Sequence, residues 1–284
     1  MAETQAKEFS LVSGLAAELT KGDLKLPSLP EVVIRIRNAL AQPDFTIDEL
    51  ARLVTAEPLL VGTILRMANS FGSRRGGGVE TTDLEIAISR IGAGMVQTAA
   101  TTFALRQIRE SAEFRGVQQL LAPEWTCASR TAATAYLVAH RSRKAKPDEA
   151  LIVGLIHNIG RIYLLSRSPR YPDLFAAPDQ VAILLDSWHA GIGKAIVECW
   201  NLPAETALAV EQQAQIDDPE QTTMATVLTT SIAIAALSPE PTAEETAALA
   251  ARPDFRRLGF ADTDIAAVAD QRDVVGQALG LGMA

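Results

Sequence analysis

Residues that favour α-helices dominate almost the whole chain. Ala, Leu, Ile, Arg, Glu and Gln recur throughout its 284 residues, and aromatic residues make up only 5%. Alternating runs of β-branched residues bounded by turns, which would indicate strands, are missing from the sequence. No sequence repeat of the kind that builds a solenoid is visible either. We therefore predict an all-α protein.

The overall composition is that of an ordinary globular protein. Hydrophobic residues make up 48% and charged residues 21%, which argues against wholesale disorder. The 26 basic and 34 acidic residues give a net charge of −8. Because non-specific binding to nucleic acid needs a positive face, this balance disfavours nucleic acid as a partner.

Cysteine usage and the N-terminal sequence indicate the cellular compartment of the protein. Cys127 and Cys199 are the only two cysteines and form no CxxC pair, as expected in a reducing compartment. The first ten residues, MAETQAKEFS, lack the basic-then-apolar order of a signal peptide. No uninterrupted apolar run approaches the roughly 20 residues that a membrane-spanning helix needs. We expect a cytoplasmic protein with no membrane partner.

Helix start and stop signals divide the chain into two predicted helical lobes. The first lobe comprises residues 1–112, and Thr46 with Glu49 is its clearest predicted capping box. The segment Thr81-Thr82-Asp83 is expected to cap a later short helix of this lobe, which runs through Ile91. The second lobe comprises residues 113–284.

Two polar residues stand side by side in the most apolar stretch of the second lobe. His157 and Asn158 lie in the segment GLIHNIG, residues 154–160, within one predicted apolar helix over residues 151–165. Burying either side chain without a partner costs a few kcal/mol, so each must be hydrogen-bonded or metal-bound. Glycines on either side would allow another backbone to approach closely. From these residues alone, a structural pair is favoured over a site, and both interpretations stay open.

Seven short segments, in the same order along the chain, make the sequence resemble the HDOD family. This family comprises signalling-output relatives of the HD-type metal-dependent phosphohydrolases, and the likeness extends from Leu26 to about Leu237. The segments are LPSLP (26–30), AEPLL (56–60), ILRMANS (64–70), AISRIG (87–92), GLIHNIG (154–160), WHAGIG (188–193) and WNLP (200–203).

The resemblance implies a metal site whose acidic ligands this chain lacks. In the hydrolytic relatives, a His, a His-Asp pair and a later Asp bind divalent ions that activate a water. Here His157 matches the His of the pair, but Asn158 replaces its Asp and Cys127 stands at the earlier His position. An amide loses the negative charge that attracts a hard cation.

Further departures from the family pattern lead to the same expectation. Gln212 and Gln213 replace a frequent His-His pair, and the last acidic ligand should fall near Thr230 or Ser231, in a stretch without carboxylates. His189, in the family's His-x-x-Gly motif, is retained. We therefore predict no catalytic residue, metal or cofactor. The expected vestigial pocket consists of His157, Asn158, His189, Gln212, Gln213 and Cys127.

Two basic stretches lie outside this pocket. Arg74 and Arg75 precede Gly76 in a glycine-rich loop without a P-loop pattern, and they are a candidate contact for an anion or a partner. The basic cluster 140–146 is predicted to be a solvated helix end, where cations complement the helix dipole.

Together these features predict both an architecture and a function. The resemblance implies an N-terminal helical bundle packed on an HD-domain-like helical bundle. It also implies a non-catalytic signal-transduction module that binds a protein partner in a bacterial signalling pathway or a nucleotide-type ligand. The alternative is a metal-dependent phosphohydrolase acting on a nucleotide or a cyclic dinucleotide. A third hypothesis, a nucleic-acid-associated regulator using the two basic stretches, is disfavoured.

Overall fold

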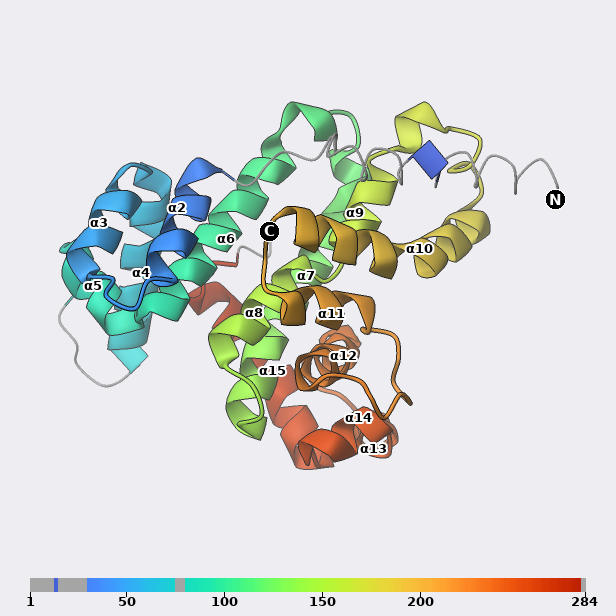
Figure 1. Cartoon of the computed structure of the whole chain (residues 1–284). Coiled ribbons are helices and arrows are strands. Elements are labelled where there is room, and N and C mark those ends of the chain that lie inside the picture. Colours follow the sequence, from blue (N-terminus) through green and yellow to red (C-terminus); the bar gives the residue numbers. More distant parts are fainter. Residues whose placement is uncertain (1–12, 15–29, 75–79, 282–284) are drawn as a thin grey trace.

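The computed structural model describes residues 13–14, 30–74 and 80–281 of the chain (Figure 1). Within these residues the regular secondary structure is helical and contains no strand, which confirms the predicted all-α class. Most of the first family segment, LPSLP, and Arg75 with the glycines after it lie outside the described residues.

The N-terminal part of the described chain contains the helices α2 (Glu31–Leu40), α3 (Ile47–Thr55), α4 (Pro58–Arg74), α5 (Leu84–Ile91) and α6 (Ala93–Glu110). Local capping begins two of them, although the capping box predicted for Thr46 and Glu49 forms only one of its two hydrogen bonds. The Thr46 side chain accepts a hydrogen bond from the backbone N–H of Glu49 at 3.1 Å, and Asp83 accepts one from Ile86 at 2.9 Å. Gly92, with φ = 81°, ends α5 and allows the chain to enter α6 at a new angle.

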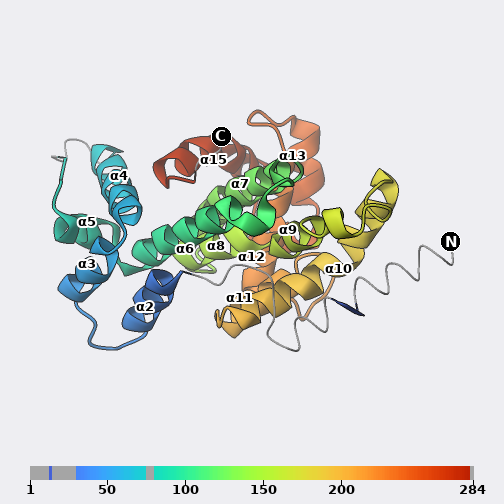
Figure 2. The same cartoon turned by 90° about the horizontal axis from the view of Figure 1, so that it is seen from above.

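The rest of the chain surrounds one long helix, α7, which packs along α8 in the middle of the molecule (Figures 1 and 2). Helices α12 and α15 also contact α7, and α11 contacts both α8 and α10. The elements after α6 are η1 (Ala112–Phe114), α7 (Gln118–Ser142), α8 (Pro147–Ile156), α9 (Ile159–Leu165), η2 (Ser168–Arg170), α10 (Pro178–Cys199), α11 (Ala204–Glu211), α12 (Thr223–Ala236), α13 (Ala243–Ala250), α14 (Pro253–Leu258) and α15 (Asp262–Ala278).

The predicted continuous apolar helix is wrong in one respect. It is interrupted at His157 and Asn158, where α8 ends and α9 begins. Residues Pro147–Arg170 have the length and composition of a membrane-spanning helix, but 83% of their most apolar window is buried inside the protein. Packing against the neighbouring helices therefore accounts for their apolar character.

Two clusters of buried apolar side chains form the core. The larger cluster extends from Ile36 in α2 through Val96 in α6 to Ile196 in α10. The smaller cluster joins the C-terminal half of α7 to α12, α14 and α15, with Phe255 fully buried in it. The division into two lobes at residue 112 stays a prediction, because the larger cluster contains side chains from both sides of it.

Candidate functional site

The break between α8 and α9 holds the His-Asn pair at a helix junction. His157 follows the last residue of α8, and Asn158 precedes the first residue of α9. Both residues are buried, with exposed fractions of 4% and 1%. The junction therefore keeps two polar side chains inside the apolar core, and their hydrogen-bond partners decide what they can do.

The His157 imidazole is fixed by one backbone contact. Its Nδ1 lies 2.8 Å from the carbonyl oxygen of Gly154, which can only accept, so Nδ1 carries the proton in the neutral ring. Burial is the main cause that lowers the pKa of His157 to about 4; the charges of His189 and Arg161 act in the same direction, and the hydrogen bond to Gly154 opposes them. The ring is thus neutral at pH 7, with an unprotonated Nε2.

Asn158 is bound to a carboxylate that the sequence interpretation missed. Its Nδ2 donates to the backbone oxygen of Glu124 at 2.7 Å and to Oε2 of Glu124 at 3.0 Å. The other Glu124 oxygen, Oε1, accepts from Nε of Arg161 at 3.1 Å. An amide fits this position because it donates, whereas an Asp would bring a second negative charge to Glu124. The Asn158 Oδ1 atom is buried and has no hydrogen-bond partner among the described residues.

The close contact between α9 and α10 brings His189 to this cluster. A Cβ atom on Gly160 would lie only 2.0 Å from the backbone oxygen of His189, so the contact requires glycine. The His189 ring is half-buried, with Nδ1 2.7 Å from the oxygen of Leu185, and desolvation lowers its pKa. Arg161 spans the same contact, since its Nη1 lies 3.2 Å from Oδ1 of Asp186 in α10.

The two predicted glutamines have different roles. Gln213 is buried and joins the cluster, because its Nε2 donates to the backbone oxygens of His157 at 3.0 Å and Val210 at 2.7 Å. The side-chain oxygen of Gln212 instead accepts from the backbone N–H of Thr222 at 3.0 Å, next to the start of α12. Gln212 therefore stabilises the connection between α11 and α12, and its described hydrogen bonds do not reach the His-Asn pair.

Cys127 lies at the edge of the cluster. The residue is exposed, and its Sγ is 4.0 Å from Oγ1 of Thr131. Partial burial of the thiol raises its pKa. The negative charge of Glu124 acts in the same direction, and the positive charge of Arg161 opposes it. It therefore lies near the Glu124–Arg161 ion pair as a protonated thiol.

Thr230 and Ser231, where the last acidic ligand is expected, make structural hydrogen bonds. Thr230 is buried, and its Oγ1 donates to Oδ2 of Asp254 at 3.4 Å. Asp254 is itself held by Arg252, whose Nε and Nη2 donate to the two carboxylate oxygens at 3.1 and 2.9 Å. Ser231 donates to the backbone oxygen of Val227 at 2.6 Å.

The donor set does not fit a hard divalent ion. Over residues 30–74 and 80–281, no group of three or more His, Cys, Asp or Glu side chains lies together in a way that could hold a metal. Glu124, the carboxylate at the pair, is bound to Asn158 and paired with the positive Arg161. Neutral amides and a cation are poor surroundings for a second cation.

Only part of the positive charge of the two basic stretches is paired where the structure describes it. Arg74 ends α4, but its side chain lies outside the description, as does the whole of Arg75. In the cluster 140–146, Arg141 pairs with Asp264 at 2.6 Å and Lys146 pairs with Glu149 at 2.7 Å.

Comparison with known proteins identifies the family. The HDOD domain model matches residues 26–216. An uncharacterized protein of Treponema pallidum (strain Nichols) is 27% identical over 206 residues, which cover 66% of this chain and 37% of that protein. The chain thus matches little more than a third of that relative's length.

Solved structures show the same fold. A "putative metal-dependent phosphohydrolase" from Shewanella amazonensis SB2B aligns with a TM-score of 0.77 at 21% identity, over 96% of this chain and 99% of that one. An HDOD domain protein of unknown function from Geobacter sulfurreducens gives 0.69 at 20% identity, over 94% and 96%. A "putative signal transduction protein" from Marinobacter aquaeolei VT8 gives 0.64 at 20% identity, over 98% and 66%. Because the family model matches well over half of the residues, the chain belongs to the HDOD domain family.

Proposed function

We propose that this protein is a non-catalytic regulatory module of signal transduction, which acts by binding a protein partner or a nucleotide-type ligand. The observation that carries the proposal is the hydrogen bond from Asn158 to Glu124, at 3.0 Å. The family resemblance assigns Asn158 to the position of the acidic metal ligand, and its amide donates to a neighbouring carboxylate. The pair therefore stabilises a helix junction instead of presenting charge to an ion.

The electrostatics around the pair support the same proposal. A divalent cation is held by carboxylates with free lone pairs. Glu124 faces Arg161 and Asn158, and the neutral His157 already uses Nδ1 on Gly154. A cation placed here would meet the positive guanidinium of Arg161 at a short distance.

The name of one similar structure, "putative signal transduction protein", agrees with this role. We extend the proposal to a cytoplasmic protein whose partner belongs to a bacterial signalling pathway. The N-terminal helices would form a bundle packed on the HD-like helices. The net charge of −8, together with the ion pairs of Arg141 and Lys146 in the cluster 140–146, argues against nucleic acid as the partner.

The phosphohydrolase alternative rests on two atoms whose lone pairs are free to bind a metal ion. The Nε2 atom of His157 is unprotonated in the neutral ring, and Oδ1 of Asn158 has no hydrogen-bond partner among the described residues. These atoms, with His189 nearby, are the remaining candidates for a weak metal site.

One experiment tests both functions. The purified protein is incubated with Mn²⁺, dialysed and analysed for metal, and hydrolysis of bis(p-nitrophenyl) phosphate is measured with Mn²⁺ present. A regulatory module should keep only traces of metal and show no turnover. His157→Ala is the test variant, and His140→Ala, an exposed histidine elsewhere on α7, is its control. Near-stoichiometric metal that is lost in His157→Ala but kept in His140→Ala would refute the metal-poor site, and Mn²⁺-dependent turnover with the same pattern would establish the phosphohydrolase instead.

A further inference from the structure

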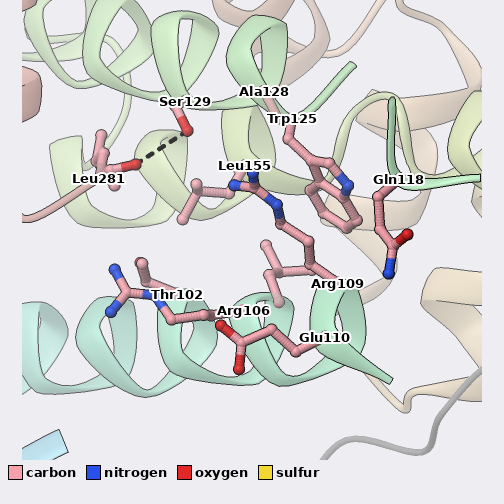
Figure 3. A pocket seen from close by; sticks show the side chains of 11 residues that line it. Thr102, Arg106, Arg109, Glu110, Gln118, Trp125, Ala128, Ser129, Leu155 and Leu281 are labelled. Atoms are coloured by element: carbon pink, nitrogen blue, oxygen red, sulfur yellow. Dashed lines mark hydrogen bonds between the residues drawn. The ribbon is translucent and has the colours of Figure 1, made fainter. Parts of the chain in front are cut away.

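A cavity of about 580 Å³ lies between α6 and α7 (Figure 3). Arg106, Arg109 and Glu110 reach it from α6, and Trp125 reaches it from α7. Leu281 closes one side, where its backbone oxygen accepts a hydrogen bond from Ser129 at 3.1 Å. The volume lies within the range of small-molecule sites.

This cavity is separate from the His157 cluster, although both use α7 and α8. Leu155 lines the cavity and His157 lies two residues further on, which turns the side chain by about 200° around the helix axis. Trp125 and Glu124 are likewise neighbours in α7 that point in different directions, one to the cavity and one to Asn158. The cavity therefore lies on the opposite face of α8.

The charge in the cavity is positive on an acidic protein. Arg106 and Arg109 are three residues apart, so both lie on the same side of α6. Both are exposed, and neither has a hydrogen bond or an ion pair with any residue that the structure describes. Glu110 is the one carboxylate among the residues of the lining. Two unpaired guanidiniums suit a phosphate group, whose oxygens match their paired donors.

The other end of the cavity suits a planar, partly polar group. Trp125 presents its indole there and is held edge-on by Phe114, with ring centroids 6.4 Å apart. Figure 3 shows the Gln118 amide beside this ring, with Arg109 between the ring and Arg106. An amide both donates and accepts, as recognition of a base edge requires. Leu105 and Leu155 add apolar surface.

We propose that this cavity binds a mononucleotide-type ligand, with the phosphate at Arg106 and Arg109 and the base against Trp125 and Gln118. This inference rests on the nucleotide-ligand branch of the proposed function and gives that ligand a place away from the HD-type pair.

Isothermal titration calorimetry at low ionic strength tests the site with AMP and GMP as probes. At least one nucleotide should bind saturably, and Arg106→Gln and Arg109→Gln should each weaken its binding roughly tenfold. The control Arg256→Gln, an exposed arginine on α14 that does not line the cavity, should leave binding unchanged. The matching nucleoside and inorganic phosphate should each bind at least roughly tenfold more weakly than the nucleotide.

The site is refuted if neither nucleotide binds at millimolar concentration. It is equally refuted if both cavity variants bind like wild type, or if inorganic phosphate binds as tightly as the nucleotide. The unfolding midpoints of the variants, which should match wild type because the changed side chains are exposed, show that the fold is intact. Metal content and hydrolysis do not depend on these arginines, so a negative result here leaves the non-catalytic assignment to be judged by its own experiment.

Discussion

Replacing Gly160 by Ala should destabilise the protein by separating α9 from α10. A Cβ at this position would lie 2.0 Å from the backbone oxygen of His189 and 2.8 Å from the backbone nitrogen of Gly193. Non-bonded contacts of a real Cβ are not found below 3.0 Å, so the two helices would have to move apart by about 1 Å. The atoms in the way belong to backbone and cannot rotate aside.

The magnitude follows from two opposing effects. Overpacking a tight core contact costs about 1–3 kcal/mol, and a backbone clash lies at or above the upper end of that range. Ala in place of Gly inside a helix returns roughly 0.8–1.0 kcal/mol. We therefore expect Gly160→Ala to lower the free energy of unfolding by about 2 kcal/mol or more.

Urea unfolding followed by far-UV circular dichroism measures this change. The matched control is Gly191→Ala in α10, where a Cβ meets no atom within 4 Å and the residue is exposed. There only the helix-propensity gain should remain, so the urea midpoint should stay level or rise. A midpoint for Gly160→Ala equal to or above that of wild type would show that α9 and α10 are not packed this closely.

Two further predictions concern the His-Asn pair. The pKa of His157 is lowered from 6.5 to about 4. Between pH 4 and pH 6.5, His157 is therefore protonated in the unfolded chain and neutral in the folded chain. The contribution of the neutral His157 ring to the free energy of unfolding is therefore complete above pH 6.5. It is lost as pH falls, so that the free energy of unfolding is lower by about 3 kcal/mol at pH 4. Urea midpoints across this range should fall more steeply for wild type than for His157→Gln, and equal slopes would contradict the burial of the ring. Asn158→Asp should place a second carboxylate against Glu124 and remove the amide donor, which should destabilise the fold by about 2 kcal/mol at pH 8. Equal urea midpoints for this variant and wild type at pH 8 would refute the arrangement around Glu124.

Features that depend on neighbours in sequence could be predicted well. Thr46 caps its helix with one of the two hydrogen bonds of the predicted capping box, and Asp83 is the member of the predicted Thr81-Thr82-Asp83 segment that caps the next, because an N-cap contact reaches only three residues along the chain. The requirement that His157 and Asn158 have partners also followed from their apolar surroundings, and both are hydrogen-bonded.

The identity of those partners could not be predicted. Glu124 lies 34 residues before Asn158 and looks like an ordinary charged residue on a helix. Arg161 gave a weak signal, as a single cation within an apolar segment, but nothing in the sequence pairs it with Glu124. Gln212 and Gln213 are neighbours, yet only Gln213 bonds to His157, because the chain turns after α11.

The sequence by itself determined the helical class, the N-caps of two helices and the family. Each of these depends on local propensity or on the identity of single residues. Only the tertiary structure decided that α8 and α9 separate at His157, that Glu124 satisfies Asn158, and that Arg106 and Arg109 share a cavity with Trp125. These arrangements arise from the packing of helices far apart in the chain, and an apolar pattern is the same whichever helix it packs against.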